Sequence, residues 1–193
     1  MVTPQQGRIL VRLARQQIEE QLGLPASQPV TAAELNEPVF RQKKGVFVTL
    51  HKRKTLRGCI GSLAAVEELA AGIRRHALNA AFQDHRFAPV SADEVADLHI
   101  EVSVLTDPQP LDYTGADQLV GRLRPGVDGV ILKGPGGESA TFLPQVWQQL
   151  PMAEPFLAHL CRKAGLADEA WRAGTLKIFT YQVQSFEEPV QAR

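Results

Sequence analysis

The stretch that decides the fold is Gly-Val-Phe-Val-Thr-Leu-His-Lys-Arg-Lys-Thr-Leu-Arg-Gly-Cys-Ile-Gly, residues 45–61. Every second residue from Val46 to Leu50 is aliphatic, which is typical of a half-buried strand. A short basic segment follows, and apolar residues resume at Leu56. The stretch therefore predicts an antiparallel hairpin. Its basic segment, Lys52 to Lys54, is interpreted as a solvated hairpin tip in preference to an anion site.

The second arm of this hairpin carries a cysteine, Cys59, between Gly58 and Gly61. Glycine tolerates positive φ and lets other groups approach the backbone closely, so the pattern indicates a bent backbone that presents the thiol. Arg57 would favour the thiolate, and adjacent backbone N–H groups would stabilise an oxyanion.

A nucleophilic cysteine also needs a base. His51 on the neighbouring arm and His85 are the candidates, and Glu101 would orient either one. Three interpretations of Cys59 stay open: a catalytic nucleophile, a ligand contact without thiol chemistry, and a structural residue. The other cysteine, Cys161, follows an apolar helical pattern and is expected to pack in a core.

Outside the hairpin, helical periodicity predicts helices over residues 4–22 and 66–82. Alternation predicts strands over 99–105 and 175–186. Weaker signals predict strands at 129–132 and 141–143, helices at 144–150 and 155–164, and capped turns beginning at Thr31 and Ser91. The order does not alternate strand with helix, so it predicts an α+β fold in which helices lie to one side of an antiparallel sheet.

The composition disfavours several classes of protein. Of the 193 residues, 44% are hydrophobic and 22% are charged, an ordinary balance for a globular domain. The 21 basic and 21 acidic side chains cancel, which disfavours binding of nucleic acid through bulk charge. No apolar run reaches a membrane-spanning length, so no membrane association is expected. Two cysteines and the lack of a visible secretory signal predict a cytoplasmic protein.

Two further sets of polar residues bear on a site. The five histidines show no metal-ligand spacing such as His-x-x-x-His, so no metal site is predicted. Asp84 and Arg86, just after the second predicted helix, are interpreted either as a helix-end cap with surface ion pairs or as the lip of a site beside Cys59.

Six motifs together carry a family resemblance. They are Leu-Arg-Gly-Cys-Ile-Gly (56–61), Ala-Ala-Phe-x-Asp-x-Arg-Phe (80–87), Ile-Glu-Val-Ser-Val-Leu (100–105), Asp-Gly-Val-Ile-Leu (128–132), Phe-Leu-Pro-Gln-Val-Trp (142–147) and Leu-Cys-x-Lys-Ala-Gly-Leu (160–166). In this order they resemble the AMMECR domain family, that of the human Alport-syndrome, midface-hypoplasia and elliptocytosis critical-region protein. The resemblance spans about residues 5–188, with His85 and Ala88 departing from expected prolines.

The resemblance implies an α+β domain of two lobes, each with its own antiparallel sheet. The larger lobe would take both chain ends, about residues 5–105 and 166–188, and the smaller lobe about 106–165. A cleft between the lobes would be lined by the Arg-Gly-Cys motif, residues 57–59.

The resemblance leaves the reaction and any cofactor unknown. Prokaryotic members, called AmmeMemoRadiSam system protein A, are associated with a Memo-like protein and a radical-SAM protein. We therefore expect a ligand-binding or catalytic component beside such partners, acting on a small-molecule ligand. The candidate catalytic residues are Cys59, His51 and Glu101, and the candidate ligand-binding residues are Arg57 as an anion anchor, Gly58, Gly61, Asp84 and Arg86.

Two alternatives come from other classes of protein. The first is a non-enzymatic adaptor that docks protein partners. The second is a nucleic-acid-associated protein that uses Arg41, Lys43, Lys44 and residues 52–54, a class that the zero net charge disfavours.

Overall fold

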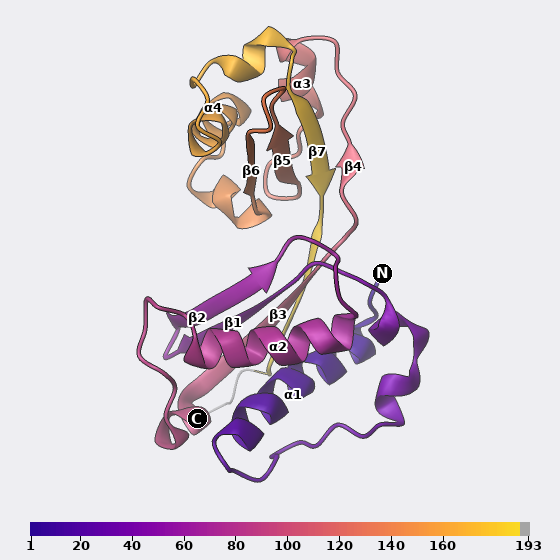
Figure 1. Ribbon diagram of the computed structural model, residues 1–193, viewed down its shortest axis with the longest axis vertical. Helices are drawn as coiled ribbons and strands as arrows, with labels where there is room; N and C mark the ends of the chain where they lie inside the picture. The colour runs from indigo at the N-terminus through magenta and orange to yellow at the C-terminus, as the bar shows by residue number, and fades with distance from the viewer. Residues whose placement is uncertain (190–193) are drawn as a thin grey trace. The chain divides into compact units, whose positions relative to one another are not determined.

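Residues 1–189 are described by a computed structural model in which the chain forms two compact units (Figure 1). Among the described residues, the first unit comprises 1–106 and 184–189, and the second comprises 107–183. The second unit is thus an insertion between two parts of the first. Each unit has its own sheet and its own hydrophobic core.

The first unit is built on a four-stranded sheet with the order β2-β1-β3-β8. The strands are β1 (Val46–Lys52), β2 (Thr55–Ser62), β3 (Leu98–Leu105) and β8 (Val183–Glu187). The predicted hairpin is confirmed as the antiparallel pair β1–β2, and β1 also pairs with β3 in antiparallel register. The aliphatic residues of β1 and β3 lie buried on one face, as their alternation predicts.

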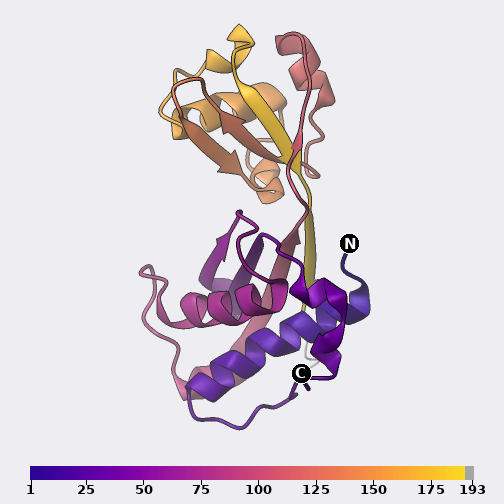
Figure 2. The same ribbon diagram turned by 45° about the vertical axis from the view of Figure 1, so that its right-hand side comes forward.

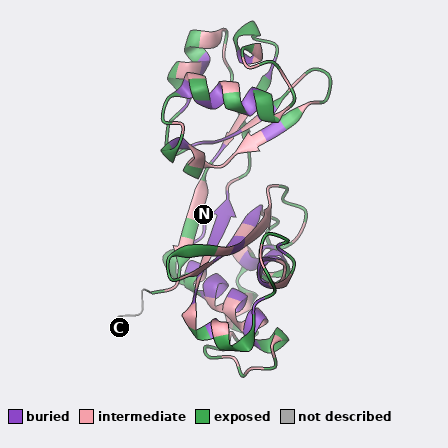
Figure 3. Ribbon diagram, turned by 90° about the vertical axis from the view of Figure 1, so that its left-hand side faces the viewer, coloured by how far each residue is buried: buried purple, intermediate pink, exposed green. Residues whose placement is uncertain are grey.

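Two helices cover that apolar face (Figures 1 and 2). Helix α1 (Pro4–Gln21) begins at Thr3, which forms a capping box with Gln6. Helix α2 (Leu69–Phe82) brings an alanine-rich stripe against β1 and β2. The buried residues of the unit concentrate where these helices meet the sheet (Figure 3).

Short 3₁₀ segments complete the first unit: η1 (Glu34–Asn36), η2 (Pro38–Arg41) and η3 (Ala92–Asp97). The two predicted capped turns are confirmed. Thr31 and Glu34 exchange side-chain and backbone hydrogen bonds, and Ser91 forms a capping box with Glu94 at the start of η3.

The second unit is built on a sheet with the order β4-β7-β5-β6. Its strands are β4 (Gln109–Pro110), β5 (Gly129–Lys133), β6 (Ser139–Phe142) and β7 (Lys177–Tyr181). Its helical segments are α3 (Ala116–Arg122), η4 (Pro144–Gln148), α4 (Ala153–Lys163) and η5 (Ala170–Ala173). The core contains Trp147 stacked on Phe156, with ring centroids 3.7 Å apart, and the fully buried Cys161, as expected.

These elements confirm the α+β class with two antiparallel sheets, but two details differ from the sequence expectations. The single strand predicted over 175–186 is two strands, β7 and β8, which belong to different sheets. Residues 166–183, predicted to return to the larger lobe, lie in the second unit because β7 pairs with β5. Within residues 1–189, no helix is both long and apolar enough to cross a membrane.

Candidate functional site

The position of Cys59 depends on an irregularity in the β1–β2 hairpin. The pairing runs regularly from Lys52 opposite Thr55 to His51 opposite Leu56, and then Leu50 lies opposite Gly58, so Arg57 is an extra residue. Without this bulge Cys59 would lie opposite Val48, on the face that the helices cover. With it, Cys59 lies opposite Thr49 on the other face, because a shift of one residue reverses the side-chain direction.

The Cys59 thiol belongs to a row of polar side chains that crosses the sheet from β2 through β1 and β3 to β8. Its sulfur lies 3.2 Å from Thr49 Oγ1, and Thr49 in turn lies opposite Glu101 on β3. Ser103 Oγ lies 3.4 Å from a Glu101 carboxylate oxygen and 3.2 Å from Ser185 Oγ on β8. Since directly opposite residues have Cβ atoms about 5 Å apart, Cys59 and Glu101 are about 10 Å apart with Thr49 between them.

Asp84 and Arg86 bind both backbone polar groups of Cys59. The Cys59 N–H donates to Asp84 Oδ2 at 2.9 Å, and Arg86 Nη2 donates to the Cys59 carbonyl oxygen at 3.3 Å. Arg86 also donates from Nε and Nη2 to the two Asp84 oxygens, at 2.9 and 2.7 Å. Strand β2 is an edge strand, so this ion pair occupies the free hydrogen-bonding edge of the sheet at Cys59.

The two side chains of this ion pair differ strongly in their exposure to solvent. The Asp84 side chain is only 4% exposed, whereas that of Arg86 is 57% exposed. Hydrogen bonds from Arg86, together with those from the backbone of Cys59 and Arg86, hold the pKa of Asp84 well below its usual range. Because the Cys59 N–H donates its hydrogen bond to the Asp84 carboxylate, this amide is not available to stabilise an oxyanion, the role expected of it from the sequence.

The two glycines of the motif are required by close approaches. A Cβ on Gly58 would lie 2.2 Å from the carbonyl oxygen of Ala80 in α2, and a Cβ on Gly61 would lie 2.3 Å from the ring of Phe47. These contacts bring the backbone of β2 directly against α2 at one glycine and an aromatic ring against the strand at the other. In this structure the glycines therefore set the packing around Cys59.

Arg57, expected to anchor an anion, binds a carboxylate of its own chain. Its Nη2 and Nε donate to the two oxygens of Glu94, at 2.9 and 3.2 Å, and Lys52 Nζ donates to the same carboxylate at 2.8 Å. These hydrogen bonds lower the pKa of Glu94 to about 2, and the one from Arg57 has the largest effect. Arg57 Nη1 is buried without a hydrogen-bond partner among the described residues. An external anion would therefore compete with Glu94 for this guanidinium.

The structure does not bring His51 to the Cys59 thiol as a hydrogen-bonded base. His51 lies opposite His99 on β3, and its side chain makes no hydrogen bond or ion pair within residues 1–189. The hydrogen-bond partner of the thiol is instead Thr49, which the sequence interpretation missed. The bulge explains why, since a regular two-residue hairpin would have placed Thr49 opposite Gly58.

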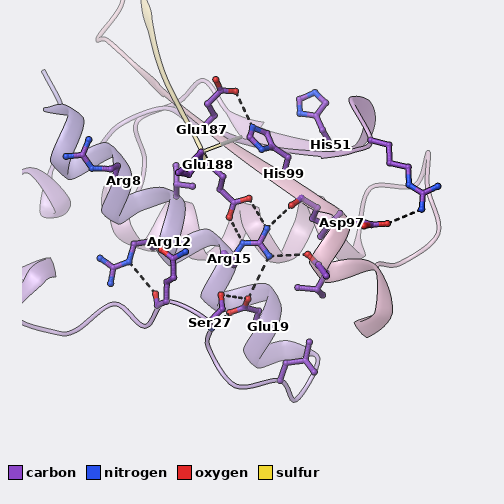
Figure 4. Close-up of a pocket in the computed structure, with 18 of the residues that line it drawn as sticks. Arg8, Arg12, Arg15, Glu19, Ser27, His51, Asp97, His99, Glu187 and Glu188 are labelled. Atoms are coloured by element: carbon purple, nitrogen blue, oxygen red, sulfur yellow. Dashed lines mark hydrogen bonds and ion pairs between the residues drawn. The ribbon is translucent and has the colours of Figure 1, made fainter. Parts of the chain in front are cut away.

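A groove near the turn of the hairpin also has polar walls (Figure 4). Its volume is about 1130 Å³, and α1, the β1–β2 turn, η3 and the end of β8 line it. His51, His99 and Glu187 lie together at this groove. Within the described residues no group of three His, Cys, Asp or Glu side chains is placed to hold a metal ion.

Comparison with known proteins gives one consistent family. The AMMECR1 family model matches residues 11–186. A protein from Methanothermobacter thermautotrophicus is 40% identical, with 95% of this chain and 94% of the relative aligned, and Protein MJ0810 from Methanocaldococcus jannaschii is 36% identical, with 97% and 92% aligned. The crystal structure of the uncharacterised protein PH0010 from Pyrococcus horikoshii superposes with a TM-score of 0.76 at 36% identity, over 94% of this chain and 91% of that one.

Proposed function

This chain belongs to the AMMECR1 family, and we propose that it is a ligand-binding or catalytic component whose ligand contacts the Cys59 thiol. The observation that carries the proposal is the attachment of both backbone polar groups of Cys59 to the Asp84–Arg86 ion pair. A functional side chain is most effective when neighbouring groups fix its backbone. Cys59 meets this requirement on a strand, with its thiol on the face that α1 and α2 do not cover.

The contacts of the thiol favour a ligand contact over unaided nucleophilic attack. Thr49 is a neutral hydroxyl and cannot serve as the general base that a nucleophilic thiol needs. Glu101 lies beyond Thr49 in the polar row, so a ligand seated on this row would meet a thiol, a hydroxyl and a carboxylate in turn. Thiol chemistry at Cys59 would take its base from the ligand or from a partner.

Alkylation of the native protein tests the accessibility that this proposal requires. We expect iodoacetamide to modify Cys59 before unfolding and to leave Cys161 unmodified. Cys161 is a matched internal control, because it is fully buried and burial raises the pKa of its thiol. Protection of both cysteines until the protein unfolds would contradict the proposal.

We also propose that the protein works in the cytoplasm with the Memo-like and radical-SAM partners of the family system. The support is the family resemblance, and the test is capture of the two purified partners by the immobilised chain. Loss of capture by a folded Cys59→Ala variant would link the partners to this site. If the Cys59→Ala variant still captured both partners in full, the adaptor alternative would be favoured. If the wild-type chain captured neither partner, the partnership would be contradicted.

A further inference from the structure

The turn of the β1–β2 hairpin places two basic residues in an unfavourable backbone conformation. Arg53 and Lys54 have φ values of +51° and +67°, and they are the two residues between the paired Lys52 and Thr55. A two-residue hairpin turn with positive φ at both positions favours Asn-Gly, because Cβ crowds the backbone in this region. Residues that break a local backbone preference are often found where their side chains serve a function.

Both side chains of this turn line the groove described above. The carboxylates that line the groove already have partners within the chain. Glu188 is bound by Arg15, and Glu19 accepts hydrogen bonds from Ser27 and lies 3.8 Å from Arg15. Glu187 lies 3.2 Å from His99 (Figure 4).

The basic side chains on the turn side of the groove have fewer partners within the chain than the carboxylates have. Arg53 contacts Asp97 at 3.3 Å with 74% of its side chain exposed, so solvent screens much of that attraction. The side chain of Lys54 makes no hydrogen bond or ion pair within residues 1–189, and the same holds for the side chain of His51, which also lines the groove. This side of the groove therefore presents positive charge that the groove's own carboxylates do not neutralise.

We propose that the turn side of this groove binds a small polyanion, a molecule carrying two or more phosphate or carboxylate groups, through Arg53, Lys54 and His51. The argument is independent of the Cys59 site and its proposed ligand. Arginine and lysine are the residues that bind such groups best, by bidentate hydrogen bonds and by point charge respectively. Asn-Gly at this turn would relieve the backbone but would leave this wall of the groove without its charge.

Two double variants separate the charge of the turn from its backbone geometry. Arg53→Gln/Lys54→Gln removes the charge and keeps the unfavourable turn, whereas Arg53→Asn/Lys54→Gly removes the charge and relieves the turn. The control is Arg41→Gln/Lys43→Gln, which removes two exposed charges of the same unit outside the groove. Isothermal titration calorimetry with inorganic pyrophosphate and with citrate, at low and high salt, measures binding, and thermal unfolding measures stability.

We expect the wild type and the control to bind pyrophosphate, citrate or both, and to bind more weakly at high salt. Both turn variants should bind about tenfold more weakly or worse. The Arg53→Asn/Lys54→Gly variant should at the same time unfold about 2–5 °C higher than the wild type. Binding of pyrophosphate alone would identify a phosphate ligand, and binding of citrate alone a carboxylate ligand. The proposal is overturned if neither anion binds the wild type, or if the turn variants bind as the control does.

Discussion

Asp84 and Cys59 are joined through the backbone, because the Cys59 N–H donates to Asp84 Oδ2 at 2.9 Å although the residues are 25 positions apart. The same carboxylate holds Arg86, which returns to the Cys59 carbonyl oxygen. The loop after α2 thereby takes the place that a further strand would have beside β2. The site and the edge of the sheet are stabilised by one ion pair.

Asp84→Asn should destabilise the first unit. The substitution removes the charge that accepts hydrogen bonds from Arg86 and Cys59, but solvent reaches the exposed Arg86 and screens part of the attraction. We therefore expect a loss of about 2 kcal/mol in the free energy of unfolding, below the 3–5 kcal/mol of a fully buried pair. Urea denaturation measures it. Asp168→Asn, which breaks the exposed pair with Arg162, is the control and should have little effect.

Gly58→Ala should be among the most damaging single-methyl changes in the chain. The new Cβ would lie 2.2 Å from a backbone oxygen of α2, which cannot turn away as a side chain can. Overpacking of this kind costs about 1–3 kcal/mol, and a strand–helix contact belongs at the upper end. Gly121→Ala in α3 is the matched control, because its Cβ would meet nothing within 4 Å and should stabilise the helix. Equal urea midpoints for the two variants would contradict the prediction.

Glu94 predicts a pH dependence with a definite sign. Its pKa is lowered to about 2 in the folded protein, mainly by Arg57 and then by Lys52, against about 4.3 when unfolded. Its stabilising contribution, about 2 kcal/mol, should be complete above pH 4.3 and lost as the pH falls toward 2. Glu94→Gln should therefore be less stable than the wild type at pH 7 and indistinguishable from it near pH 2. Asp93→Asn, on the same turn, should show no such convergence in urea denaturation.

Arg15 should determine how firmly β8 is held. Its guanidinium, 12% exposed, binds the Glu188 carboxylate and the carbonyl oxygens of Val95 and Leu98. Arg15→Met leaves all three acceptors without this donor, so we expect a loss of about 3 kcal/mol. The Ile100 amide, which donates to Glu188, should exchange its hydrogen faster than in the wild type. Arg8→Met on the same helix is the control, and unchanged exchange at Ile100 in Arg15→Met would refute the role of Arg15.

Much of the fold follows from local pattern. The alternation in β1 and β3 and the capping box at Ser91 act over a few residues, and each is found where the sequence predicts it. The prediction of a single strand over 175–186 is wrong because it, too, relied on local pattern alone. Its side-chain alternation continues through Gln182, but the chain leaves one sheet there and joins another, and alternation does not record which neighbour a strand has.

The site was less predictable because it depends on register and on tertiary contact. The motif identified Cys59, but its neighbour Thr49 follows only from the bulge at Arg57. The attachment of Asp84 to a backbone amide leaves no signal in residue spacing. Only the place of Asp84 and Arg86 just after a helix suggested that they lie near Cys59, and their contacts with its backbone bear out that proximity.

The insertion of residues 107–183 between β3 and β8 has a consequence for biosynthesis. The sheet and core of the inserted unit lie wholly within that segment, so all of its parts leave the ribosome before β8 does. The first unit, in contrast, cannot complete the edge of its sheet beside β3 until Ser185 and Glu188 have been synthesised. The order of translation therefore favours an inserted unit that is finished while its host still lacks a strand.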